Sequence, residues 1–243
     1  MSETSFLNYV YVKIKTNMEI KLMFIRHSKS CSNFIRELSR YNHKRNRKER
    51  IKSLSSKIQD PGLTSIGHEM AKKYGPELRI KAVDAGFDID SATIGSSALR
   101  RAKQTVKLLF PTTQKVVVYP HTSELGLVLE NTPKRPNDYS EPDWKKFLKH
   151  LKYAYPKQSD FIVVGHGSYL KDVWKKATNS SRSLHNLDSF VICGDLDDRG
   201  HLRINETTFL SYTGLVSAKG AKGECCGRSD KSAIKERGDQ SPS

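Results

Sequence analysis

Short apolar runs alternate with stretches of helical periodicity along most of this chain. Residues 20–25, 115–119 and 160–164 are apolar runs typical of strands buried on both faces, and residues 91–94 indicate a shorter strand. Helical spacing of apolar residues covers 31–41, 64–75, 99–110, 144–155 and 168–176, and late strands are expected at 187–193 and 201–205. The alternation predicts the α/β class: a single three-layer domain with a largely parallel sheet covered by helices on both faces.

Capping and turn residues set the expected ends of two helices. Thr64 can cap the helix that follows the turn signal at Asp60-Pro61-Gly62, and Gly75-Pro76 is expected to end it. Pro111 is the expected stop for the helix over 99–110.

The composition changes near both ends of the chain. Residues 1–17 indicate an N-terminal extension, and residues 18–213 form the expected domain. Residues 214–243 are rich in Gly, Ser and Lys, which predicts a disordered tail. No linker or internal repeat divides residues 20–210, so one domain is favoured over two.

The formal net charge of +16 is concentrated in one segment. Residues 36–58 hold nine Lys or Arg and two Glu, and we expect a basic insert at about 36–60. Such a run can be a solvated face, a funnel for an anionic substrate or ligand, or a nucleic-acid contact. Only Tyr41 supplies an aromatic ring there, which weakens the case for binding single strands.

Other compositional features exclude several classes of protein. No apolar stretch reaches the roughly 18–20 residues of a membrane-spanning helix, and the N-terminus lacks a signal-peptide pattern. The four cysteines fit neither a zinc pattern nor a disulfide framework. We therefore expect a soluble cytoplasmic protein without a metal or other cofactor; the sequence leaves the oligomeric state open.

Polar residues follow four of the predicted strands. Arg26-His27 ends the first, with Ser30 and Asn33 just beyond, and Ser96-Ser97 leads toward Arg101 after the second. Glu124 lies beyond the third, and Gly165-His166-Gly167 ends the fourth. Because the carboxyl ends of parallel strands meet at one edge of a sheet, these residues are expected to form a single site.

Four segments of the chain, taken in order, resemble motifs of the histidine phosphatase superfamily, the phosphoglycerate mutase-like family. Arg26-His27-x-x-Ser30-x-x-Asn33 resembles its opening motif, and Leu63-Thr64-x-x-Gly67 is similar to its LT-x-x-G segment. Ser97-x-x-x-Arg101-Ala102-x-Gln104-Thr105 and Val163-Val164-Gly165-His166-Gly167 resemble the two later motifs. The resemblance spans about residues 20–193.

The resemblance implies phosphoryl transfer through a phosphohistidine on His27, the nucleophile, which must be neutral to attack. Arg26, Arg101 and His166 would hold the phosphoryl oxygens, because a guanidinium can donate two charge-assisted hydrogen bonds to them. Ser30 and Asn33 are expected to add phosphate contacts.

Glu124 is the expected general acid and base, with Glu130 as its competitor. No metal is required by this chemistry.

Two departures from the family pattern bear on function. Ser28 and Lys29 stand where glycine and an acidic or amide residue are more usual; the Ser28 hydroxyl could bind phosphate and Lys29 adds charge at the site. Leu125-Gly126 replaces the pattern of true mutases, which favours a phosphatase acting on a phosphorylated small molecule or phosphoprotein. The alternatives are a phosphoglycerate mutase-type phosphotransferase and a non-catalytic binder of phosphorylated or polyanionic ligands.

Overall fold

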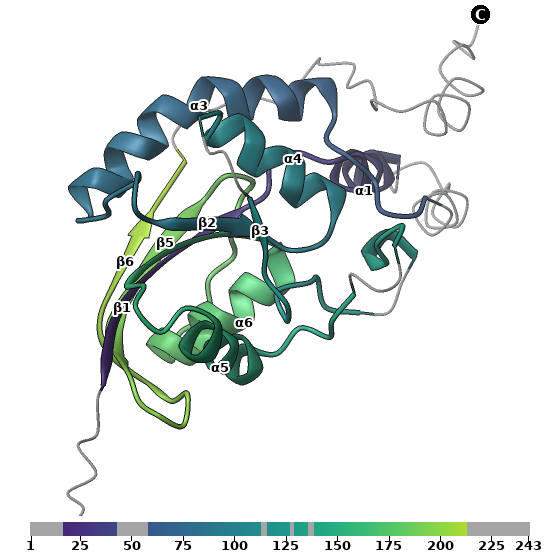
Figure 1. Ribbon diagram of the computed structural model, residues 1–243. Coiled ribbons are helices and arrows are strands. Elements are labelled where there is room, and N and C mark those ends of the chain that lie inside the picture. The colour runs from purple at the N-terminus through teal and green to yellow at the C-terminus, as the bar shows by residue number, and fades with distance from the viewer. Residues whose placement is uncertain (1–16, 43–57, 113–115, 127–128, 136–138, 213–243) are drawn as a thin grey trace, which may run out of the picture.

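The computed structural model describes residues 17–42, 58–112, 116–126, 129–135 and 139–212. The predicted N-terminal extension, the disordered tail and most of the basic insert lie outside these ranges. Within them, a single mixed sheet carries six strands in the order β3-β2-β4-β1-β5-β6 (Figure 1). The strands are β1 (Met18–Arg26), β2 (Thr93–Ser96), β3 (Val117–Val118), β4 (Asp160–Gly165), β5 (Ser189–Leu196) and β6 (Leu202–Leu210).

Four strands of the sheet are parallel. β1 pairs with β4, β4 with β2, and β2 with β3 in parallel register, whereas β5 runs antiparallel to β1 and β6 antiparallel to β5. The helices are α1 (Cys31–Asn42), α3 (Ser65–Asp84), α4 (Arg100–Leu109), α5 (Trp144–Ala154) and α6 (Gly167–Thr178), with a 3-10 turn η2 at Leu129–Asn131.

Helices cover both faces of the sheet, with α3 and α4 on one side and α5 and α6 on the other (Figure 1). Strand β1 shows why: Ile20, Leu22 and Phe24 pack with buried residues of α5 and α6, whereas Met23 and Ile25 pack with those of α3 and α4. A strand that is apolar on both faces must be buried on both. The predicted α/β class, with a largely parallel sheet between helices, is confirmed.

Helix α3 corrects one prediction. It does not end at Gly75-Pro76 but runs on to Asp84, with Pro76 inside it. The buried face of α3 continues past the proline through Leu78 and Ala82. Burial of that apolar stripe outweighs the backbone hydrogen bond that proline forfeits.

Several element ends also differ from their predicted positions. Strand β3 is shorter than the run 115–119, while β5 and β6 extend beyond the predicted late strands. Among the described residues, no helix is both long and apolar enough to cross a membrane.

Candidate functional site

The parallel strands deliver the predicted site residues to one edge of the sheet. Arg26 ends β1 and His27 follows it, Ser97 follows β2, and His166 follows β4 as the N-cap of α6. The His27 N–H donates to the carbonyl of Gly165 at 3.0 Å, which ties the end of β1 to the end of β4. The rings of His27 and His166 lie 5.1 Å apart between centroids.

A backbone contact orients the His27 ring. Its Nδ1 lies 2.7 Å from the carbonyl oxygen of Ser28. A carbonyl oxygen can only accept, so Nδ1 carries the hydrogen in this contact, and Nε2 of the neutral ring holds the free lone pair. This is the tautomer that a nucleophile attacking through Nε2 requires.

The surroundings keep both histidines neutral. His27 is 2% exposed and His166 is fully buried. Burial, followed by the positive charges of Arg101 and Arg26, lowers the pKa of His27 well below its ordinary value. Burial and the charge of Arg101 do the same to the pKa of His166. Both rings are therefore uncharged at neutral pH.

A hydrogen bond with Ser97, which follows the neighbouring strand β2, holds the His166 ring. Its Nε2 lies 2.5 Å from the hydroxyl oxygen of Ser97, while its Nδ1 is buried without a hydrogen-bond partner in the described protein. A Ser97 hydroxyl that donates to Nε2 would leave the hydrogen of the neutral ring on Nδ1. In that tautomer Nδ1 is an unused donor at the same sheet edge as His27.

Two arginines are fixed near the histidines with part of each guanidinium unused. Arg26 donates to the carbonyl of Leu184 and lies against Gly167, where an added Cβ would approach the Arg26 Nε to 3.1 Å. Arg101 donates through Nη1 to the carbonyl of Glu130 at 2.8 Å and through Nη2 to Asn131 at 3.0 Å. The Nε atoms of both arginines are buried without a partner among the described residues.

The charge around these arginines is balanced by a carboxylate. Burial lowers the pKa of Arg26 and of Arg101, and in both cases Glu124 is the acidic group that most opposes the shift. One buried and one half-buried arginine with unused donors form a setting suited to an oxyanion such as a phosphoryl group.

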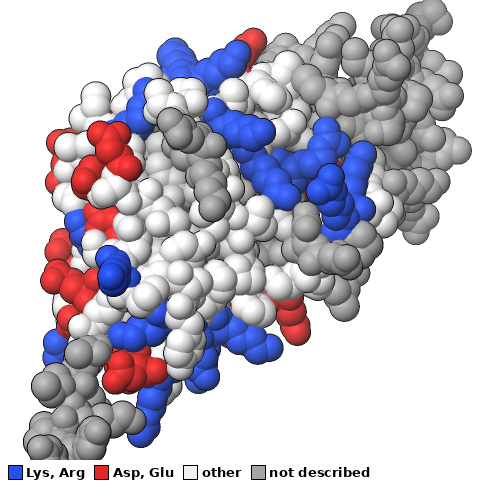
Figure 2. All heavy atoms as spheres, viewed as in Figure 1, with Lys and Arg blue, Asp and Glu red and all other residues white. Residues whose placement is uncertain are grey.

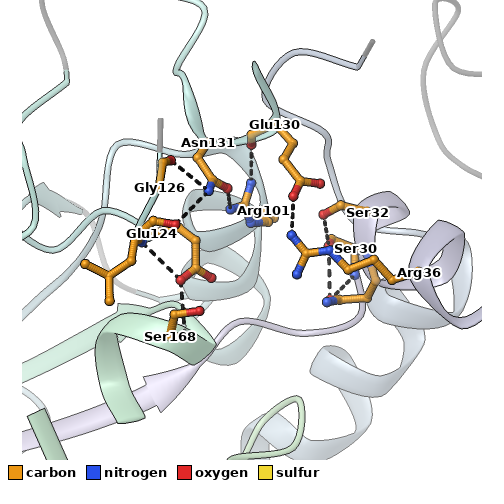
Figure 3. Close-up of polar contacts among 11 residues, drawn as sticks. Ser30, Ser32, Arg36, Arg101, Glu124, Gly126, Glu130, Asn131 and Ser168 are labelled. Carbon is orange, nitrogen blue, oxygen red and sulfur yellow. Dashed lines mark hydrogen bonds and ion pairs between the residues drawn. The ribbon is translucent and has the colours of Figure 1, made fainter. Parts of the chain in front are cut away.

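Glu124 and Glu130 hold different positions (Figure 3). Glu124 Oε1 accepts the backbone N–H of Ser168 at 3.1 Å, in the first turn of α6, and that of Leu125 at 3.2 Å. Glu130 instead pairs through Oε1 with Arg36 of α1, and its Oε2 is buried without a partner in the described chain. The charge of Glu124 acts on both Arg26 and Arg101, and that of Glu130 acts on Arg101.

Asn33 is held by its neighbours so that its donor group is available. Its Oδ1 accepts from the backbone N–H of Ser30 at 3.2 Å, from the Ser30 hydroxyl at 3.0 Å and from Asn186 at 3.2 Å. The amide donor of Asn33 takes part in none of these contacts. The Ser30 hydroxyl therefore helps to position Asn33.

Sequence reasoning missed two asparagines of the site. Asn186 also donates to the carbonyl of His27 at 2.8 Å, and Asn131 donates to the carbonyls of Leu125 and Gly126 while accepting from Arg101. Asn186 lies in a loop and Asn131 ends the 3-10 turn η2. Neither belongs to a recognisable motif, so only the tertiary structure reveals them.

The second and third motifs brace the loop that carries His27. Both the backbone N–H and the hydroxyl of Thr64 donate to the carbonyl of Lys29, at 3.0 and 3.1 Å, and Thr64 caps α3 through the N–H of Gly67. Gln104 accepts from the N–H of Leu63 at 2.8 Å. The hydroxyl of Thr105 accepts from the N–H of Ser28 at 3.1 Å.

The two unusual residues after His27, Ser28 and Lys29, both make contacts within the protein. The Ser28 hydroxyl donates to the carbonyl of Gly67 at 2.7 Å, so it links the His27 loop to the first turn of α3. The Lys29 ammonium lies 2.5 Å from a carboxylate oxygen of Glu37 in α1. Its charge is therefore paired within the protein.

No group of three or more residues suited to a metal ion occurs among the described residues. The residues that do converge here, histidine, arginine, asparagine and glutamate, suit proton transfer and anion binding.

No family model and no curated protein matches this sequence. The solved structures that are similar to this one include phosphatases and a phosphoglycerate mutase. Phosphoserine phosphatase from Entamoeba histolytica, in complex with 3-phosphoglyceric acid, is 18% identical, over 80% of this chain and 98% of that chain, with a TM-score of 0.48.

Two further structures are similar to this one. The protein histidine phosphatase SixA, in complex with tungstate, is 12% identical over 78% of this chain and 97% of its own, with a TM-score of 0.47. Phosphoglycerate mutase from Bacillus anthracis is 17% identical over 78% of this chain and 93% of its own, also with a TM-score of 0.47. Because the identities are this low, the role of each residue rests on the geometry of this chain.

Proposed function

We propose that the protein is a phosphatase that hydrolyses a phosphomonoester through a phosphohistidine on His27. One observation carries the proposal: a neutral histidine with a free Nε2 lies close to two arginines, Arg101 buried and Arg26 half-buried, whose buried Nε donors are unused. This combination places a nucleophile next to a preformed binding site for an oxyanion.

In the first step, Nε2 of His27 attacks phosphorus and the bond between phosphorus and the ester oxygen breaks. Arg26, Arg101 and His166 hold the phosphoryl oxygens, and the amide donor of Asn33 adds a contact. The leaving oxygen takes a proton from Glu124. Since Glu124 Oε1 already accepts two backbone N–H groups, Oε2 is the oxygen that carries this proton.

In the second step, the same carboxylate removes a proton from water, and the resulting hydroxide attacks the phosphohistidine. The bond between phosphorus and Nε2 breaks, inorganic phosphate leaves, and Glu124 is protonated again. His27 returns to its neutral form, so the cycle needs no further reactant.

The substrate would be a phosphorylated small molecule or a phosphoprotein, and the test uses para-nitrophenyl phosphate as the probe. The wild-type protein should release inorganic phosphate and, when quenched during turnover, carry an acid-labile phosphoryl group. Both signals should be lost in His27→Ala and retained in His150→Ala, which removes a histidine from α5 instead.

Three results would contradict the proposal. They are full hydrolysis by His27→Ala, tight phosphate binding without turnover by the wild-type protein, and transfer of the phosphoryl group to a second substrate molecule in place of water.

A further inference from the structure

Arg36 is a cation close to the candidate site that the proposed phosphatase chemistry does not use. Arg36 lies in the second turn of α1, the helix that begins directly after the His27 loop. Its side chain is 50% exposed, whereas the carboxylate of its partner Glu130 is 7% exposed. The pair therefore consists of a buried anion and a cation that still reaches solvent.

The position of Arg36 relates it to the candidate site. In Figure 3 the side chain extends from α1 toward Arg101, with its guanidinium below Glu130. Its charge contributes to lowering the pKa of His27, of Arg26 and of Arg101, so it lies within electrostatic reach of all three. A substrate whose phosphate contacts Arg26 and Arg101 would therefore lie within the electrostatic reach of Arg36.

Glu130 serves as the anchor that fixes Arg36. It contacts one nitrogen of the guanidinium, Nη2, and its own backbone carbonyl holds Arg101. A guanidinium has five N–H donors in a planar fork, so one carboxylate contact leaves donors for a second anion. Because Glu130 keeps its partner when that second anion binds, no buried carboxylate is left unpaired.

We propose that Arg36 is a specificity residue that selects phosphomonoesters bearing a second anionic group, a carboxylate or another phosphate, on the organic part. This inference rests on the proposed function, because it assumes that the ester phosphate lies between Arg26 and Arg101. Glu130 holds the guanidinium in place before the substrate arrives, which reduces the entropy lost on binding.

Matched pairs of small substrates test the selection. One pair is 3-carboxyphenyl phosphate and its uncharged carboxamide; the other is 1,4-phenylene bisphosphate and phenyl phosphate. The measured quantity is the preference, the ratio of kcat/KM for the anionic member to kcat/KM for its neutral partner. Removing one charge-assisted contact in Arg36→Gln should lower the preference about tenfold.

Two further variants separate selection from general effects of charge and structure. Arg36→Lys keeps the charge but not the planar fork, so it should restore part of the preference. Lys107→Gln removes an exposed cation from the last turn of α4, and the wild-type preference should persist in it. A loss of activity that is equal for both members of each pair in Arg36→Gln, or an equal loss of preference in Lys107→Gln, would overturn the proposal.

Binding keeps this test independent of turnover. The same pairs are titrated by calorimetry into His27→Ala, alone and combined with Arg36→Gln. A preference for the anionic member that disappears in the double variant supports the role of Arg36, even if the wild-type protein hydrolyses neither compound and the proposed phosphatase activity fails. An unchanged preference contradicts the role of Arg36 alone. The carboxylate and bisphosphate pairs also show which anion is preferred.

Discussion

At the residue scale, the chemistry depends on which carboxylate oxygen is free to exchange a proton. The sequence places Glu124 and Glu130 six residues apart and leaves both as candidates. In the structure, Glu130 is paired with Arg36, while Glu124 Oε1 is fixed by backbone N–H groups and Oε2 has no partner among the described residues. The contacts therefore favour Glu124 as the acid and base.

Replacing each carboxylate by its amide distinguishes the two. Glu124→Gln should lower kcat by about 10²–10⁴-fold, the usual contribution of a general acid or base, with little change in the affinity for inorganic phosphate. Glu130→Gln retains an oxygen for Arg36 and its backbone carbonyl for Arg101, so its kcat should fall far less. Steady-state kinetics with para-nitrophenyl phosphate decide this. If Glu130→Gln is the slow variant, the acid is misassigned.

At the scale of elements, contacts with α3, its N-cap and α4 hold the loop that carries His27. A Cβ built at Gly67, in the first turn of α3, would lie 2.0 Å from the backbone oxygen of Lys29. Contacts this short do not occur between real atoms, so any larger residue must push the loop that carries His27 away from α3. This explains physically why glycine stands at the end of the Leu63-Thr64-x-x-Gly67 segment.

Gly67→Ala should therefore damage both stability and activity. Overpacking of this kind typically costs about 1–3 kcal/mol of unfolding free energy, and the displaced loop should also lower kcat. Gly165→Ala is the matched control, since the nearest atom to its Cβ would be a flexible Leu170 methyl at 3.3 Å. Urea denaturation and kinetics measure the two effects. Equal losses in both variants would argue against a special constraint at Gly67.

At Pro76, packing overrides the local preference of the sequence. Gly75-Pro76 is a strong stop signal in the sequence, yet α3 runs through it. Such a signal is overridden when buried residues both before and after the proline favour a continuous helix. One face of α3 is buried from Gly67 to Ala82, on either side of Pro76 in the sequence.

At the scale of the whole molecule, burial of two neutral histidines makes stability depend on pH. The pKa values of His27 and His166 are lowered in the folded state, so below pH 6.5 the unfolded chain binds protons that the folded protein does not. Stability is thus fully present above the unfolded pKa and falls as the pH drops below it. Each histidine should contribute about 1.4 kcal/mol per pH unit in that window.

Urea unfolding between pH 8 and pH 5 measures this slope. In His166→Gln, which retains a polar side chain beside Ser97, the slope below pH 6.5 should be smaller by about one proton. Parallel curves for the variant and the wild-type protein would show that His166 is protonated equally in the folded and unfolded states.

Positive charge is distributed unevenly over the surface of the molecule. Lys and Arg side chains gather on the side of the molecule where α1 and α4 lie (Figure 2). Arg36, Lys134 and Arg135 are exposed described residues of α1 and of the loop after η2. A field of one sign favours the approach of anionic substrates and weakens as salt is added.

The sequence by itself determined the α/β class, the strand ends that carry Arg26, His27 and His166, and the position of Arg101 at the start of its helix. These follow from local periodicity and from motifs whose spacing is fixed along the chain. Only the tertiary structure decided that Glu130 pairs with Arg36 while Glu124 accepts backbone N–H groups. It also decided that Ser28 holds the His27 loop to α3, and that Asn131, Asn186 and Arg36 lie near the site. Those features depend on contacts between residues far apart in the chain, which local patterns do not encode.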